Sequence, residues 1–76
     1  MSTAAPKEIE LEDIEIDLLL EGLYRAHGFD FRDYSRASIK RRILELMRGE
    51  KMETVSAFQS RVLHDAACLE RFLMGL

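Results

Sequence analysis

Basic side chains are concentrated in one short segment of an otherwise acidic chain. They are Arg36, Lys40, Arg41, Arg42, Arg48 and Lys51. Such groups bind anions, and the guanidinium group of arginine can hold a carboxylate with two parallel hydrogen bonds. Concentrated charge of one sign usually lies on a surface that meets a partner of the opposite sign. The pattern therefore predicts a binding surface for acidic groups.

The charge is divided between two parts of the sequence. Net charge is −3 over 76 residues, but residues 1–24 carry −6 and residues 32–51 carry +4. Two interpretations follow from this separation. The acidic segment can neutralise the basic one within the fold, or the basic segment can remain free to meet another molecule. The sequence leaves both interpretations open.

Catalysis would require a nucleophile, a base or a metal in converging positions. Cys68 is the single cysteine, and we expect it to be a small buried or half-buried residue. His27 and His64 lack ligand spacing to Cys68 or to each other, and the glycines are isolated, so neither a metal site nor a phosphate-binding loop is predicted. We therefore expect no catalytic residue, metal or cofactor site in this chain.

Composition is typical of a small globular domain of the cytoplasm. Hydrophobic residues make up 47% of the chain, which suits a packed core and argues against disorder. A single cysteine permits no internal disulfide, which fits a reducing compartment. No apolar run approaches the ~20 residues that cross a bilayer, and the first residues lack a signal-peptide core. Neither membrane insertion nor export is expected.

Helical periodicity predicts an all-α fold, a compact four-helix domain that follows a flexible tail at residues 1–8. The helices are expected at residues 12–26, 36–48, 55–64 and 66–74. The expected N-caps are Asp13, Ser35, Thr54 and Asp65. Gly28 and Gly49 are expected to stop the first two helices.

The helix at residues 36–48 separates an apolar face from a charged one. At about 100° per residue, its apolar side holds Ile39, Ile43, Leu44, Leu46 and Met47. The opposite side holds Arg41, Arg42, Glu45 and Arg48. Arg36 and Lys40 fall at the N-terminal end of the apolar arc, so they must project beyond the core or be covered by another surface. Glu45 can pair with Arg41 and Arg48 within the helix, which would leave the other three cations free.

Apolar residues at helical spacing define the rest of the expected core. They are Leu19, Leu20, Leu23 and Tyr24 in the first helix, Val55, Phe58, Val62 and Leu63 in the third, and Leu69, Phe72, Leu73 and Leu76 in the fourth. Phe29 and Phe31 lie in the connector between the first two helices. Because these two rings are large and apolar, we expect them to plug the core.

Several motifs follow one another in a distinctive order. They are Leu23-Tyr24-Arg25, Gly28-Phe29-Asp30-Phe31 and Tyr34-Ser35-Arg36-Ala37-Ser38-Ile39-Lys40-Arg41-Arg42-Ile43, with a shorter match at Thr54-Val55-Ser56-Ala57-Phe58. Each is common alone, but their order and spacing are not. Together they resemble the N-terminal helical domain of the chemotaxis receptor methyltransferases, the CheR family. The resemblance covers about residues 10–76.

This resemblance implies a function for residues 9–76. Family members use S-adenosylmethionine to methylate glutamates on chemoreceptor cytoplasmic helices. Their small helical domain precedes an α/β catalytic domain, closes over its active site and holds a basic second helix toward the receptor. For this chain the resemblance implies a substrate-recognition and lid domain. The receptor contacts would be Arg36, Arg42 and Arg48, with Lys40 and Arg41 as neighbours.

The chain departs from the family pattern in two respects. Glu45 and Leu46 stand where some relatives keep further basic residues, which weakens the positive field. The linker and the α/β domain that follow the fourth helix in the family are missing, so we expect a fragment. S-adenosylmethionine would then be the cofactor of the parent enzyme, and the parent's catalytic domain would be a partner. Without that domain, two fragments can dimerise through exposed apolar surface.

Two other classes of function remain open. The first is an architectural module whose basic helix packs on an acidic neighbouring domain. The second is a nucleic-acid-binding helical domain, because a basic helix after a turn is also typical of helix-turn-helix proteins. The sequence pI near 5.3 disfavours the second class, since DNA-binding domains usually have a pI above about 9. We therefore expect no nucleic-acid partner.

Overall fold

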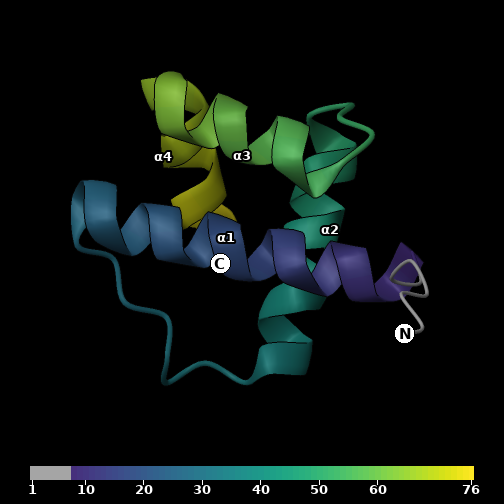
Figure 1. Cartoon of the computed structure of the whole chain (residues 1–76). Helices are drawn as coiled ribbons and strands as arrows, with labels where there is room; N and C mark the ends of the chain where they lie inside the picture. The colour runs from purple at the N-terminus through teal and green to yellow at the C-terminus, as the bar shows by residue number, and fades with distance from the viewer. Residues whose placement is uncertain (1–7) are drawn as a thin grey trace, which may run out of the picture.

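The chain folds into four α-helices that enclose one apolar core. The computed structural model describes residues 8–76, with side chains described from Leu11 onward. The helices are α1 (Glu8–His27), α2 (Arg36–Gly49), α3 (Val55–His64) and α4 (Ala66–Gly75). In Figure 1, α1 crosses in front of α2, while α3 lies along α1 and packs against α4. The described part contains no strand, so the all-α prediction is confirmed.

The helix boundaries agree closely with those predicted from the sequence, except at α1. The bounds of α3 are those predicted, and α2 and α4 each extend one residue further. However, α1 begins at Glu8, four residues before the predicted start, and ends at His27. Asp13 therefore lies inside the helix, and its prediction as an N-cap was wrong. Glutamates favour helix and complement the positive end of the helix dipole, which accounts for the earlier start. Most of the expected tail, residues 1–7, lies outside the described residues.

The other three predicted N-caps are confirmed. The Thr54 hydroxyl accepts a hydrogen bond from the Ala57 amide at 3.1 Å, and Ser35 accepts one from Ser38 at 3.4 Å. The Asp65 carboxylate accepts bonds from the amides of the second and third residues of α4. These contacts satisfy amide groups that a helix leaves unpaired in its first turn.

The two glycines predicted as helix stops behave differently. Gly28 has φ +76° and its amide donates to the Tyr24 carbonyl at 2.8 Å, so it ends α1 in the left-handed conformation as expected. Gly49 is instead the last residue of α2. The left-handed residue after α2 is Lys51, with φ 60°. The chain therefore turns two residues later than the sequence indicated.

The core takes apolar residues from all four helices. Its buried members are Ile16, Leu19, Leu23, Ile39, Ile43, Met47, Val55, Phe58, Val62, Cys68 and Phe72. The remaining predicted core positions are partly buried, except Tyr24, whose side chain is 49% exposed. Phe29 and Phe31 are partly buried against this core, and the Phe31 ring meets the Phe72 ring edge-on at 6.4 Å. The connector rings therefore plug the core as predicted.

Burial should make the Cys68 thiol unreactive. The residue is 1% exposed, and burial raises the pKa of its thiol. Because the thiolate is the nucleophile, the folded protein should react with an aromatic disulfide reagent far more slowly than free cysteine at neutral pH. In concentrated guanidinium chloride the reaction should become fast. Rapid reaction of the folded chain in a stopped-flow absorbance assay would contradict this prediction.

Candidate recognition surface

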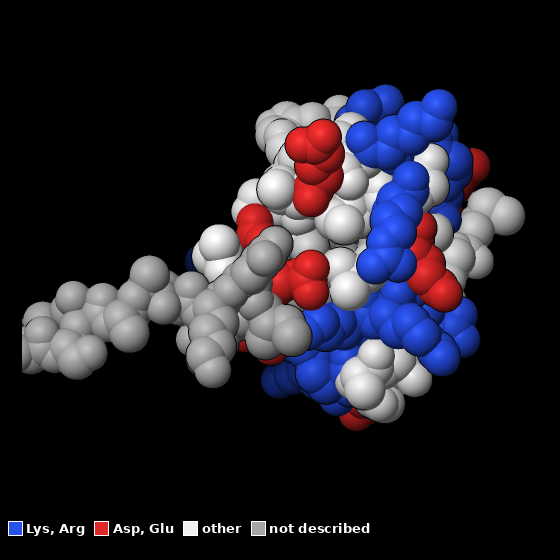
Figure 2. Space-filling model, turned by 90° about the vertical axis from the view of Figure 1, so that its right-hand side faces the viewer, with Lys and Arg blue, Asp and Glu red and all other residues white. Residues whose placement is uncertain are grey.

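Basic side chains gather on one side of the molecule. Figure 2 looks onto the right-hand side of Figure 1, where Lys and Arg form a broad band with few acidic groups among them. The contacts of the helix α2 cations divide them into three groups. One group is bound to α1, one reaches α4, and one faces solvent. Whether the acidic segment neutralises the basic one within the fold therefore has a different answer for each group.

Arg36 and Lys40 are bound to the acidic helix α1. Arg36 Nη1 lies 2.5 Å from Asp17 Oδ1, and Arg36 Nη2 donates to the Asp13 carbonyl at 3.0 Å. Lys40 Nζ lies 2.6 Å from Asp13 Oδ1 and 3.9 Å from Glu12, and the lysine side chain is only 25% exposed. Helix α1 therefore covers most of Lys40, whereas Arg36 is paired with α1 but remains about half exposed. Both cations are therefore paired within the fold, and their predicted contact with a receptor remains a prediction.

Arg42 points along the side of α2 toward α4. Its Nη1 atom donates to the Gly75 carbonyl at 3.5 Å, which is a long hydrogen bond. That carbonyl belongs to the last turn of α4, where unpaired carbonyl groups attract cations. Arg42 is exposed and forms no ion pair with the described residues. It therefore stands at the margin of the outward face of α2.

Arg41 and Arg48 occupy the outward face of α2, opposite the buried residues Ile39 and Ile43. Both arginines are exposed, and within the described residues neither lies in an ion pair. The predicted pairs with Glu45 are not formed. A shallow depression runs along this face, lined by Ala37, Lys40, Arg41, Leu44, Glu45 and Arg48. We call Ala37, Arg41, Leu44, Glu45 and Arg48 the α2 strip.

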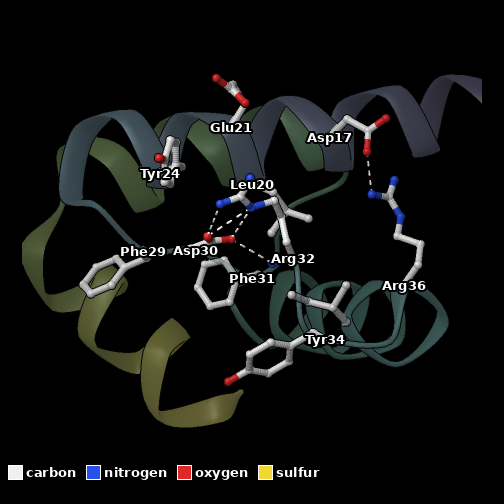
Figure 3. Close-up of a pocket in the computed structure, with 11 residues that line it drawn as sticks. Asp17, Leu20, Glu21, Tyr24, Phe29, Asp30, Phe31, Arg32, Tyr34 and Arg36 are labelled. Carbon is white, nitrogen blue, oxygen red and sulfur yellow. Dashed lines mark hydrogen bonds and ion pairs between the residues drawn. The ribbon is translucent and has the colours of Figure 1, made fainter.

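A second hollow lies between α1 and the connector that precedes α2. Figure 3 shows its aromatic side chains, which come from Tyr24, Phe29, Phe31 and Tyr34. Its volume is about 530 Å³. Its charged groups are paired locally: Arg32 binds Asp30 at 2.6 Å and lies over the Tyr24 ring at 5.8 Å. The sequence could not reveal this hollow, because it forms only when the connector folds back along α1.

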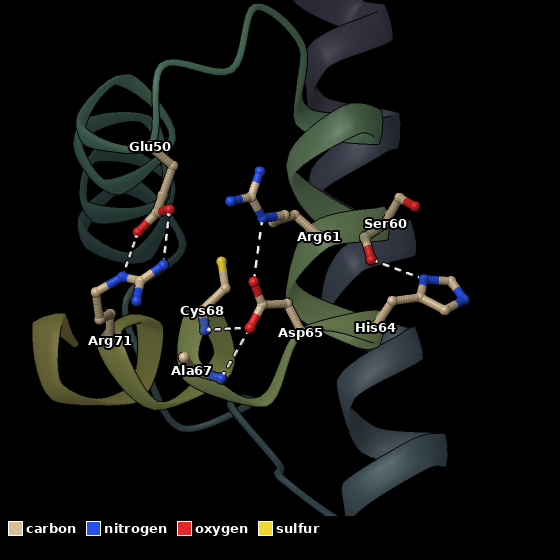
Figure 4. A network of polar contacts seen from close by, with 8 residues as sticks. All are labelled: Glu50, Ser60, Arg61, His64, Asp65, Ala67, Cys68 and Arg71. Atoms are coloured by element: carbon tan, nitrogen blue, oxygen red, sulfur yellow. Dashed lines mark hydrogen bonds and ion pairs between the residues drawn. The ribbon is translucent and has the colours of Figure 1, made fainter.

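Polar contacts also join the ends of α2, α3 and α4. In Figure 4 the Arg71 side chain holds Glu50 through two hydrogen bonds, at 2.7 and 3.0 Å, and this lowers the pKa of the Glu50 carboxyl. The backbone amide of Cys68 and then the Arg61 side chain lower the pKa of Asp65. Each of these charged groups has its partner within the network. The network therefore serves the fold and leaves no charge free for a ligand.

The described residues contain neither a metal-binding cluster nor a membrane-spanning helix. No three histidine, cysteine, aspartate or glutamate side chains converge among them. None of the described helices combines the length and apolar character needed to cross a bilayer. In the described part, the α2 strip places two exposed cations, Arg41 and Arg48, on one helix face without ion partners. It is therefore the candidate functional site.

Comparison with known proteins identifies the domain. The family model described as "CheR methyltransferase, all-alpha domain" matches residues 14–76. This chain belongs to that family. A protein of Pseudomonas putida named "Putative methyltransferase Cher3" is 53% identical over 64 residues, which is 84% of this chain and 23% of that protein. The CheR chain thus spans about a quarter of the length of this relative. No solved structure matches it.

Family membership confirms the resemblance seen in the sequence. The matched residues include all of α2, α3 and α4 and the part of α1 that carries Asp17. Every residue of the α2 strip therefore lies within the region that defines the CheR all-alpha domain.

Proposed function

We propose that this chain is the substrate-recognition and lid domain of an S-adenosylmethionine-dependent protein-glutamate O-methyltransferase that acts on chemoreceptors. In this proposal the α2 strip contacts the acidic cytoplasmic helices of the receptor. The observation that carries it is the presence of two exposed arginines, Arg41 and Arg48, with no ion partner among the described residues. They lie within a domain of a methyltransferase family.

The spacing of the two arginines suits a helical partner. Arg41 and Arg48 are seven residues apart, so they lie about two turns, or ~10 Å, apart on one face of α2. Glutamates seven residues apart on a second helix have the same spacing. Leu44 is partly buried between them and offers a small apolar contact. Exposed charge pairs contribute only about 0–1 kcal/mol each, so the interaction should be weak, oriented and sensitive to salt.

The proposal assigns the chemistry to a part of the protein beyond this chain. The Cher3 relative is about four times as long as the matched region. We place S-adenosylmethionine and the methyl transfer in an α/β catalytic domain of the same parent protein, in the cytoplasm. The present domain would orient the receptor glutamate and close over the active site of that catalytic domain. It would contribute no catalytic residue.

Titration with receptor helices tests the proposal. A soluble cytoplasmic fragment of a chemoreceptor, with glutamates at its methylation positions, should bind the 76-residue chain and shift the NMR signals of α2 amides. A fragment with glutamines at those positions is the control and should bind more weakly, because it lacks the carboxylates. Affinity should fall as salt is added. Equal affinity for both fragments, or shifts confined to another helix, would contradict the proposal.

One observation favours the architectural alternative. Three aliphatic side chains on α1, Leu11, Ile14 and Leu18, are each about half exposed, at 50%, 48% and 54%. Exposed apolar patches often mark contacts between proteins or domains. In this second candidate function, the basic helix α2 packs on an acidic neighbouring domain, and the apolar side chains of α1 add to that contact. Charge reversal on the α2 strip distinguishes the two candidates.

A further inference from the structure

The α2 strip carries one acidic side chain between its two arginines. Glu45 is exposed and lies four residues after Arg41 and three residues before Arg48. Both spacings permit ion pairs on a helix. Within the described residues, however, no arginine or lysine nitrogen comes within ion-pair distance of Glu45. The carboxylate is therefore as free to meet a partner as the two guanidinium groups are.

We infer that Glu45 is a specificity-determining residue, and that the α2 strip recognises a helix with a cation placed between two acids. This inference rests on the proposed function and names the pattern of the partner. Along the axis of α2, the charges run positive, negative and positive, at intervals of about 6 Å and 4.5 Å. A complementary helix carries acid, base and acid with intervals of four and three residues, in the order set by its direction.

The order of charges then matters as well as their sum. An acidic residue opposite Glu45 would face a like charge, and an uncharged residue there would leave the glutamate without a partner. Specificity of this kind comes from repulsion of the wrong partner as much as from attraction of the right one. Arg36 and Lys40 are paired with α1, so fewer unpaired cations remain on α2 to offset the negative charge of Glu45. The influence of Glu45 on the choice of partner is therefore larger.

Two peptides of identical composition can test this inference. Each is a capped alanine-based helix of about twenty residues, long enough to be substantially helical. Both carry glutamates seven residues apart. One has a lysine between them, on the same face, and the other has alanine there and its lysine on the opposite face. Total charge is the same, so a difference in affinity reports the contact with Glu45.

We expect the peptide with the central lysine to bind about two- to fivefold more tightly, which corresponds to one exposed charge pair. NMR titration at low salt measures both dissociation constants. Glu45→Gln should bring their ratio close to one, and Glu45→Lys should invert it. Glu70→Gln is the matched control: Glu70 is exposed on α4, outside the strip, and its loss changes net charge equally. That variant should retain the wild-type ratio.

The outcomes separate this inference from the proposed function. If the wild-type chain binds both peptides with equal affinity, the role of Glu45 is overturned while recognition of acidic helices stands. If Glu45→Gln leaves an unequal ratio unchanged, the preference arises elsewhere and the inference is again overturned. If neither peptide binds and the receptor fragment does not bind, both proposals fail.

Discussion

Phe72→Ala is expected to remove a large part of the stability of the domain. Phe72 is 1% exposed and joins α4 to α3 and to the connector before α2. Its ring lies 5.8 Å from that of Phe58 and 6.4 Å from that of Phe31. Removing a buried phenylalanine side chain typically costs about 3–5 kcal/mol. A domain of this size has a total stability of only about 4–11 kcal/mol. Thermal unfolding followed by circular dichroism should show a midpoint at least ~12 °C lower.

Two further variants make this prediction specific. Met74→Ala changes the same helix at a side chain that is 82% exposed, and its effect should stay within about 0.5 kcal/mol. Phe72→Leu keeps much of the buried volume, so it should unfold cooperatively even if the alanine variant does not fold. A midpoint for Phe72→Ala within a few degrees of the wild-type value would show that this ring cluster does not hold the helices together.

Reversing both charges, with Arg41→Glu and Arg48→Glu, is expected to weaken binding of an acidic receptor helix at least about tenfold. Each substitution removes an attractive pair and introduces a repulsive one, and exposed pairs are worth up to about 1 kcal/mol. The free energy of unfolding should change little, because both side chains are exposed and unpaired within the described residues. NMR titration measures the affinity, and urea denaturation measures the stability.

Arg36→Gln combined with Lys40→Gln is expected to lower the stability of the domain and to leave its affinity for the receptor helix nearly unchanged. These side chains hold α2 to α1 through Asp17 and Asp13, so their loss should lower the free energy of unfolding by about 1 kcal/mol. Affinity for the receptor helix should remain within about twofold of the wild-type value. If reversal at Arg41 and Arg48 instead lowers the stability of the parent protein and leaves receptor affinity unchanged, the architectural candidate is correct.

The sequence alone determined the four helices, apart from the start of α1, and the inward faces of α2 and α3. Ser35, Thr54 and Asp65 were identifiable as caps because a cap depends on a side chain and amides two or three residues away. The buried positions of α2, Ile39, Ile43 and Met47, follow from the helical period in the same way. Such features are local, so residue order is sufficient to predict them. The family resemblance had the same basis in consecutive motifs.

The tertiary structure alone decided which cations are free. Helical periodicity placed Arg36 and Lys40 at the edge of the core, but their partners in α1 lie 19 and 27 residues away in sequence. Only the crossing of α1 over α2 brings these groups together. The same crossing leaves Arg41, Glu45 and Arg48 facing outward without internal partners. Charge pairing across a fold depends on how helices cross, and neither composition nor spacing encodes that geometry directly.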